Sequence, residues 1–228
     1  MYKILNKIKS PDDVKSLSIN DLKTLSSEVS NYIHEVVSEK GGHYSSPLGA
    51  VDLTIALHYV YNTPVDKLIW DVGHQAYAHK IITGRKNEFK NIRQYKGISG
   101  FLKIDESKYD SFGAGHASTS ISAGLGYAHS RDKDKKNHQI VSIIGDGAMT
   151  GGLAYEGLNN LGFHKTQMTV VLNDNSYSIS ESVGALSKYL TRIVTNPTYN
   201  KLRKDLWNLT DKIPTISNPI KKFIKKTE

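Results

Sequence analysis

The chain has 228 residues, of which 38% are hydrophobic and 23% are charged, and it contains no cysteine. This is the composition of a globular protein, and a chain of this length buries about 70% of its unfolded surface on folding. Without cysteine, disulfide frameworks, thiolate metal sites, iron–sulfur clusters and cysteine nucleophiles are excluded. The sequence has no apolar run near the roughly 18 residues of a membrane span and no apolar signal-peptide core at its start, so we expect a cytoplasmic protein with no membrane partner.

The net charge of +8 is concentrated at the C-terminus. Residues 201–228 carry +5 of it, whereas residues 1–200 carry only +3. The body of the chain lacks the basic stripe with interleaved aromatic residues that is typical of a nucleic-acid groove. We therefore expect a solvated basic helical tail and no nucleic-acid partner.

The first 62 residues have the pattern of helices. Ser10 and Ser18 each precede a helix-start sequence, with proline or an acidic residue in the first turn. After Ser18, apolar residues recur at helical spacing until the glycine pair at 41–42 ends the run. One further helix is expected over residues 47–61.

Three short segments rich in Ile, Val and Leu are bounded by polar or glycine turns, which is typical of buried strands. They are residues 67–71, 139–144 and 168–172, with helices expected between them over 118–130 and 151–161. Strands that alternate with helices predict an α/β fold, with a mostly parallel sheet covered by helices on both faces. Such a sheet binds its ligand outside the carboxyl ends of the strands.

Beyond residue 186 the apolar periodicity becomes weak and the polarity mixed. We therefore assign residues 1–186 to one α/β domain. Residues 187–228 are interpreted as a variable loop and basic helical tail of the same domain.

Polar motifs follow the second and third expected strands. The second strand ends in Gly-Asp-Gly around Asp146, and the third ends in Asn-Asp-Asn, whose last residue is Asn175. The 27 residues between Gly147 and Asn175 suit one helical crossover, so Asp146 and Asn175 should lie side by side on adjacent strand ends. Their oxygen atoms suit Mg²⁺, and a helix beginning near Gly151 would direct its N–H groups toward a diphosphate. Each motif alone is an ordinary turn sequence, but their shared position favours a site.

Histidines occur in loops expected near the same edge. His43 follows the glycine pair, His74 follows the first strand, and His116 precedes the helix expected over 118–130. Neutral histidine can donate a hydrogen bond to phosphate or orient a partner, although each of these residues taken singly is as easily an ordinary loop residue. His74 and His79 lie five residues apart, which is poor spacing for a shared metal on one helix face.

Motifs of other phosphate-binding and hydrolytic enzymes fit less well. Gly113-x-Gly115-x-x-Ser118 is only partly similar to a dinucleotide-binding loop, and no clear strand precedes it. The sequence contains no Walker A motif, no His-Glu-x-x-His and no Gly-x-Ser-x-Gly.

The motifs together resemble a known enzyme family. Gly-Asp-Gly around Asp146, followed after 27 residues by Asn175, resembles the thiamine diphosphate motif of transketolase-type enzymes. Longer strings are similar to 1-deoxy-D-xylulose-5-phosphate synthases over about residues 21–184, and more loosely to the end. The resemblance implies the thiamine diphosphate-binding fold, with a diphosphate-binding domain that is incomplete at the C-terminus. The strings are Gly41–His43, Leu68–Tyr77, Gly115–Ser122 and Leu172–Glu181.

The resemblance also implies an activity and a set of site residues. The family joins pyruvate to glyceraldehyde 3-phosphate with loss of CO₂, giving 1-deoxy-D-xylulose 5-phosphate for isoprenoid, thiamine and pyridoxal synthesis. By motif matching, Mg²⁺ would be held by Asp146, Asn175 and a backbone carbonyl near Tyr177. His43 would be the catalytic residue that faces the substrate and assists proton transfer. The residues around the diphosphate would be His74, Gly115, His116, Ala117, Gly147, Ala148 and Asn175.

The chain departs from the family in length. Family members are more than twice as long, and the glutamate that activates their aminopyrimidine ring lies in a second domain, which is absent here. The resemblance therefore implies an N-terminal portion that anchors the cofactor and is inactive alone, and by family analogy a homodimer. The alternatives are the anchoring subunit of a split transketolase and a non-catalytic assembly module.

Overall fold

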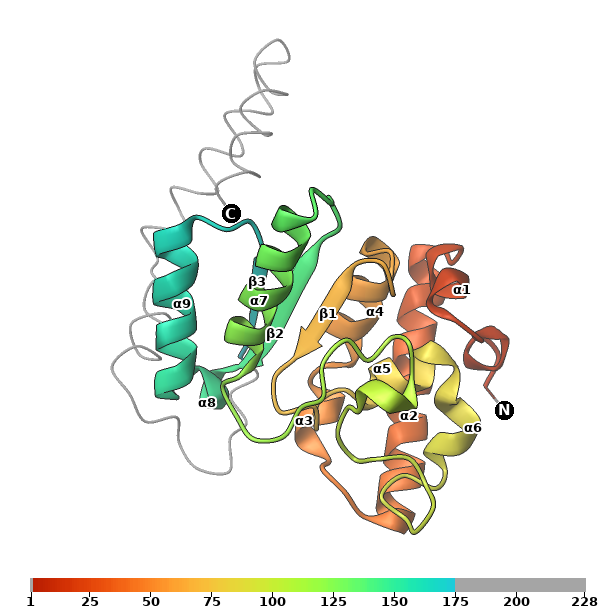
Figure 1. The fold of residues 1–228 in the computed structure, drawn as a ribbon. Coiled ribbons are helices and arrows are strands. Elements are labelled where there is room, and N and C mark those ends of the chain that lie inside the picture. Colours follow the sequence, from red (N-terminus) through yellow and green to blue (C-terminus); the bar gives the residue numbers. More distant parts are fainter. Residues whose placement is uncertain (1, 175–228) are drawn as a thin grey trace, which may run out of the picture. The chain divides into compact units, whose positions relative to one another are not determined.

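Three parallel strands lie at the centre of residues 2–174, the part of the chain that the computed structural model describes. They are β1 (Lys67–Trp70), β2 (Ile140–Gly145) and β3 (Thr169–Asn173), in the spatial order β1-β2-β3 (Figure 1). Both neighbouring pairs run parallel. The predicted parallel sheet is confirmed, and each strand differs from its predicted range by one residue at one or both ends.

Helices precede, connect and cover these strands (Figure 1). In chain order the described residues form η1 (Leu5–Lys7), α1 (Pro11–Lys15), α2 (Ile19–Lys40), α3 (Ser45–Leu48), α4 (Val51–Val60), α5 (Tyr77–Lys80), η2 (Ile81–Arg85), α6 (Lys86–Phe89), η3 (Ile104–Glu106), α7 (Ser120–Lys133), α8 (Asp146–Met149) and α9 (Gly152–His164).

Both faces of the sheet are covered, because successive side chains of a strand point to opposite sides. Trp70 of β1 packs in the apolar cluster that contains Leu57 of α4. The preceding residue, Ile69, packs instead with Ala128 of α7. α9 lies on the same side as α7, since its residue Ala154 shares a cluster with side chains of β2 and α7. The prediction of helices on both faces is confirmed.

The single helix predicted over residues 47–61 is wrong. The structure has two helices there, α3 and α4, with Gly49 and Ala50 between them. Ala50 leaves the helical conformation, with φ −108° and ψ 2°, and it follows glycine, which stabilises a helix less than any residue except proline. The apolar spacing that predicted one helix continues across this break.

The N-terminal helices pack into a core separate from the sheet. Val29 of α2, Ile81 of η2 and Tyr77 of α5 are buried members of this core. α2 begins where the sequence predicts, because the hydroxyl of Ser18 accepts a hydrogen bond from the backbone N–H of Asp21 at 3.2 Å. The core therefore fixes α5, from which Tyr77 reaches the candidate site.

The part of the chain described here contains no helix with both the length and the apolar character needed to cross a membrane. The predicted boundary between residues 186 and 187 lies outside the described residues, as does the basic tail, so both stay predictions.

Candidate functional site

The candidate site lies at the carboxyl ends of the strands. Trp70 pairs with Ile143 and Gly145 pairs with Asn173, so the loops after β1 and β2 and the end of β3 meet at one edge of the sheet. This confirms that the two strand-end motifs lie on adjacent strands. Asn175 and Tyr177 themselves lie outside the described residues, and their places in a metal site stay predictions.

Three histidines from different loops gather at this edge. The ring centroids of His43 and His74 lie 4.7 Å apart. Those of His74 and His116 lie 6.0 Å apart, with the two rings within 8° of parallel. The ring of Phe101 lies 6.0 Å from that of His43 and 5.9 Å from that of His116. The structure thus brings together three histidines that the sequence could assess only one at a time.

The environment keeps two of these imidazoles neutral at pH 7. Burial, together with smaller effects of the nearby His43 and His116, lowers the pKa of His74 to about 4. Burial also lowers the pKa of His43, as does the positive charge of Arg93, whose Nη1 lies 3.5 Å from His43 Nδ1. The buried Nδ1 of His74 has no hydrogen-bond partner in the described part of the chain. Because such atoms are normally paired, this one indicates a place for a ligand group.

The His43 loop is fixed by close contact with α5. The backbone N–H of His43 donates to Tyr77 Oη at 3.3 Å. Gly42 precedes it with φ 143°, and a Cβ at this position would lie 2.9 Å from the same Tyr77 oxygen. Only glycine allows both this backbone conformation and so close a contact with the Tyr77 hydroxyl. The glycine pair predicted to end α2 therefore also positions His43.

The His116 loop is joined to the loop after β2. Ser118 Oγ donates to the backbone carbonyl of Ala148 at 2.7 Å. A Cβ on Gly151 would lie 2.1 Å from Ser118 Oγ, so the approach of the two loops requires glycine there. This contact places Gly115 to Ala117, which are exposed, beside the loop that contains Gly147 and Ala148. All five were predicted to surround a diphosphate; which of them contact one stays a prediction.

Asp146 follows β2 directly, as predicted, and begins the short helix α8. Its carboxylate is half-buried, and no hydrogen bond or ion pair to it is found within residues 2–174. The helix predicted from residue 151 begins at Gly152, after α8. No group of three histidine or acidic side chains arranged to hold a metal occurs in this part of the chain.

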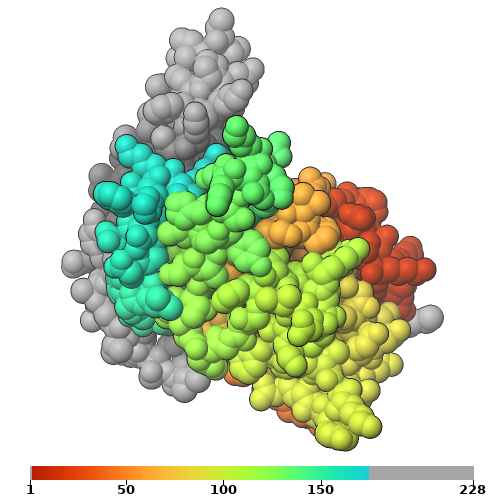
Figure 2. Space-filling model, viewed as in Figure 1, coloured from red at the N-terminus to blue at the C-terminus, as the bar shows by residue number. Residues whose placement is uncertain are grey.

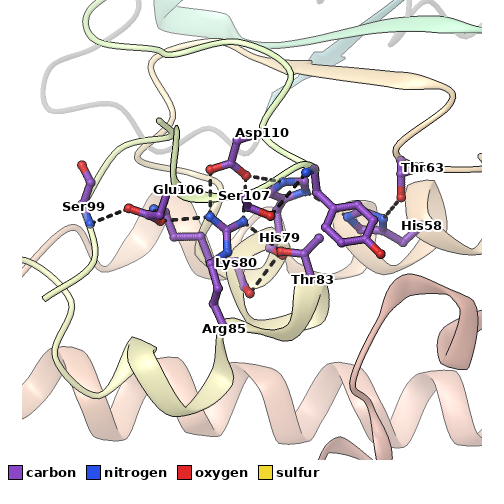
Figure 3. A network of polar contacts seen from close by, with 11 residues as sticks. His58, Thr63, His79, Lys80, Thr83, Arg85, Ser99, Glu106, Ser107 and Asp110 are labelled. Atoms are coloured by element: carbon purple, nitrogen blue, oxygen red, sulfur yellow. Dashed lines mark hydrogen bonds and ion pairs between the residues drawn. The ribbon is translucent and has the colours of Figure 1, made fainter. Parts of the chain in front are cut away.

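His79 belongs to a different, buried network (Figure 3). Its Nδ1 lies 3.0 Å from His58 Nε2, and its Nε2 lies 3.1 Å from Asp110 Oδ1. Arg85 donates to both oxygens of Asp110, at 2.7 and 2.8 Å, and to Glu106 at 2.9 Å. Burial lowers the pKa of both histidines. Burial alone would raise the pKa of Asp110, but the hydrogen bonds from His79 and Arg85 outweigh it and hold that pKa below its usual range.

The network holds the segment between α6 and α7 against α5 and η2. Glu106 and Asp110 lie in this segment, and Glu106 also accepts from the backbone N–H of Ser99 at 2.9 Å. The same segment carries Phe101 and His116, and Figure 2 shows it in yellow-green at the surface beside α7. The buried ion pairs therefore support the loop that supplies two rings of the candidate site.

The sequence also matches known proteins. A model of the 1-deoxy-D-xylulose-5-phosphate synthase family matches residues 5–228. The chain belongs to this synthase family. The 1-deoxy-D-xylulose-5-phosphate synthase of Caldanaerobacter subterraneus subsp. tengcongensis is 52% identical over 98% of this chain, and that of Halothermothrix orenii is 53% identical over the whole chain. The chain spans 36% of the length of each of these relatives.

A solved structure shares the fold. The transketolase from Campylobacter jejuni superimposes with a TM-score of 0.66 at 22% sequence identity, over 74% of this chain and 30% of the transketolase chain. The predicted α/β fold class is confirmed by this likeness. The 1-deoxy-D-xylulose-5-phosphate synthases are thiamine diphosphate-dependent transferases.

Several residues that build the site were not found from the sequence. Tyr77, Phe101 and Ser118 contact or position the predicted residues, and Asp71 binds the loop of Ser118. Asp71 carried a usable signal, because it is a charged residue at the end of an expected buried strand. Phe101 carried none, since it lies in an irregular segment without apolar periodicity.

Proposed function

We propose that this chain is the N-terminal, cofactor-anchoring part of a 1-deoxy-D-xylulose-5-phosphate synthase. The reaction of the whole protein would condense pyruvate with glyceraldehyde 3-phosphate, with loss of CO₂, to give 1-deoxy-D-xylulose 5-phosphate. The observation that carries the proposal is the arrangement at the strand ends, in a chain of this family. There, the rings of the neutral residues His43 and His74 are adjacent, and the ring of His116 lies next to that of His74. Beside them is the segment after β2, whose first residue is the half-buried Asp146.

The residues at this edge fit thiamine diphosphate and Mg²⁺. Asp146 would hold the metal together with Asn175 and the backbone carbonyl of Tyr177, since carboxylate, amide and carbonyl oxygens suit Mg²⁺. The unpartnered Nδ1 of His74 supports a diphosphate beside it, because a phosphate oxygen would satisfy that atom. The remaining diphosphate contacts are assigned to Gly115, His116, Ala117, Gly147, Ala148 and Asn175.

The cofactor, when bound, would supply a nucleophilic thiazolium carbon and a cationic ring that can take up the electron pair released with CO₂. The chain's own residues bind, orient and transfer protons. His43 is half-buried, and burial beside Arg93 favours its neutral form, which can accept or deliver a proton at pH 7. The hydrogen bond from its backbone to Tyr77 fixes its position, so His43 is proposed to face the substrate.

The proposal includes a homodimer and a cytoplasmic location, as the resemblance to the synthases implies. Because the chain spans 36% of its relatives, activity is expected of a protein that also contains their remaining part. The chain by itself is proposed to bind the cofactor without turning over substrate.

The proposal is tested by calorimetric titration of the chain with thiamine diphosphate in the presence of Mg²⁺. Saturable, Mg²⁺-dependent binding is expected, and Asp146→Ala should abolish it. Asp134→Ala is the matched control, because Asp134 is an exposed carboxylate at the end of α7 and its loss should leave binding unchanged. The absence of binding at millimolar cofactor would contradict the proposal. The alternative of an assembly module would be favoured if Asp146→Ala bound no cofactor but still associated with a full-length synthase as tightly as the wild-type chain does.

A further inference from the structure

Asp71 is a fully buried carboxylate at the carboxyl end of β1. Its Oδ1 accepts a hydrogen bond from the backbone N–H of Ser118 at 2.7 Å, and its Oδ2 accepts one from the backbone N–H of Ser120 at 2.9 Å. Ser120 is the first residue of α7. Asp71 therefore caps the N-terminus of α7 although it lies on a separate strand. Hydrogen bonds to a charged acceptor are stronger than those between neutral groups, so this cap is a strong one.

The same contact sets an unusual backbone conformation. Ser118 has φ 71°, in the left-handed region that residues with a side chain rarely adopt. In this conformation its N–H points to Asp71 while its hydroxyl donates to the carbonyl of Ala148 at 2.7 Å. Ser118 thus joins three segments: the end of β1, the His116 loop and the loop after β2.

We propose that Asp71 is a positioning residue for the diphosphate site. Acting through Ser118, it fixes the His116 loop relative to the loop that contains Gly147 and Ala148. Asp71 does not contact the ligand, because it is completely buried and each of its oxygens already accepts a backbone N–H. The expected effect of Asp71 on cofactor binding rests on the proposed function. Its effect on the position of the His116 loop does not, because that loop is part of this chain.

The chain offers a closely matched control. Asp66 lies at the opposite end of the same strand and is 8% exposed. Its Oδ1 accepts the backbone N–H of Gln139 at 2.8 Å, and its Oδ2 accepts that of Asn62 at 2.6 Å. Asp66 and Asp71 therefore have the same chemistry and comparable burial, but only Asp71 lies at the candidate site. A purely structural role would make their replacements equivalent.

The first measurement needs no cofactor. Amide hydrogen exchange of the full chain is followed by mass spectrometry in the wild type, Asp71→Asn and Asp66→Asn. Asp71→Asn should accelerate exchange about tenfold in the segment 113–121, because it weakens two charge-assisted hydrogen bonds. Asp66→Asn should leave that segment unchanged and act instead around Gln139. Equal exchange of residues 113–121 in all three proteins would overturn the proposal.

The second measurement is the dissociation constant of thiamine diphosphate with Mg²⁺, taken beside the melting temperature. Asp71→Asn should raise the dissociation constant about tenfold, whereas Asp66→Asn should lower the melting temperature and leave the dissociation constant unchanged. If Asp71→Asn does not fold, Ser118→Ala replaces it, because this variant removes only the bond to Ala148 and should also weaken binding. Equal dissociation constants for the two aspartate variants would overturn the inference. Failure of the wild type to bind would contradict the proposed function, while hydrogen exchange still decides whether Asp71 fixes the loop.

Discussion

The guanidinium of Arg85 forms two hydrogen bonds to the carboxylate of Asp110, at 2.7 and 2.8 Å, in a network that is almost closed to solvent (Figure 3). Paired carboxylate–guanidinium contacts of this kind fix geometry as well as charge. Here they anchor the irregular segment between α6 and α7, in which Asp110 lies, to Arg85 at the end of η2.

Asp110→Ala should be strongly destabilising. The change leaves Arg85 and His79 buried with one partner fewer, and breaking a buried ion pair in this way costs about 3–5 kcal/mol. The free energy of unfolding, measured by urea titration at pH 7.5, should fall by this amount. Replacing both partners, in Arg85→Met with Asp110→Leu, should cost less than the sum of the two single changes, because no unpaired buried charge remains.

An exposed ion pair provides the control for this prediction. Lys136 pairs with Asp134, and the two side chains are 62% and 49% exposed. Asp134→Ala should therefore change the free energy of unfolding by at most about 1 kcal/mol. A loss for Asp110→Ala no larger than that for Asp134→Ala would show that the buried network contributes little to stability.

The stability of the fold should fall at mildly acidic pH because of His58 and His79. Burial holds the pKa of both below the ordinary value of 6.5, so the folded protein keeps them neutral. Protons then bind more readily to the unfolded chain than to the folded one. The free energy of unfolding therefore keeps its full value above about pH 6.5 and decreases as the pH falls below 6.5. For each pH unit by which folding lowers the pKa of a histidine, the free energy of unfolding falls by up to about 1.4 kcal/mol on acidification.

The test is urea unfolding of the wild type and His58→Gln at pH 7.5 and pH 5. The loss of stability between these two values should be smaller in His58→Gln, which has one fewer histidine to protonate. His129→Gln removes an exposed histidine and should keep the wild-type loss. An identical loss in all three proteins would contradict the assignment to the buried pair.

The strand-end motifs could be predicted because the geometry of a parallel sheet is general. Asp146 and His74 each follow a short apolar segment, and parallel strands bring such positions to one edge whatever the rest of the fold. The same argument could not separate His74 from His79, which follows it by five residues. The chain turns into α5 between them, and His79 enters the buried network of Asp110 instead of the site.

The buried ion pairs that support the site could not be predicted from the sequence, for a physical reason. Phe101 and His116 are placed by ion pairs between Arg85, Glu106 and Asp110, and such contacts between distant positions leave no periodic pattern. The break between α3 and α4 was missed for a different reason, because here a periodic pattern was present and misleading. A continuing apolar pattern favoured one helix there, and the low helix propensity of Gly49 prevailed.

Glu28 should stabilise the N-terminus of the chain. Its carboxylate accepts the backbone N–H groups of Lys3, Ile4 and Leu5 at 2.7, 2.9 and 2.7 Å. Glu28→Gln keeps the size but removes the charge and one acceptor oxygen, so the free energy of unfolding should fall by about 1–3 kcal/mol. Glu39→Gln is the control, since that side chain is 71% exposed. Equal stabilities for the two variants, measured by urea titration, would show that the carboxylate does not anchor this segment.

Two adjacent glycines should respond differently to replacement by alanine. A Cβ on Gly151 would lie 2.1 Å from Ser118 Oγ, whereas a Cβ on Gly152 has no atom within 4 Å. Gly151→Ala must therefore push the Ser118 hydroxyl away from the carbonyl of Ala148 and loosen the contact between the two loops of the site. We expect weaker binding of thiamine diphosphate and a loss of about 1–3 kcal/mol in stability, because overpacking is costly.

Gly152→Ala provides the matched control at the start of α9. It should leave cofactor binding unchanged and alter the free energy of unfolding by less than about 1 kcal/mol, in the stabilising direction, because alanine favours a helix more than glycine does. Calorimetric titration and urea unfolding of both variants check the pair. If Gly151→Ala bound the cofactor as tightly as Gly152→Ala does, the close approach of Ser118 to the loop after β2 would not be needed for the site.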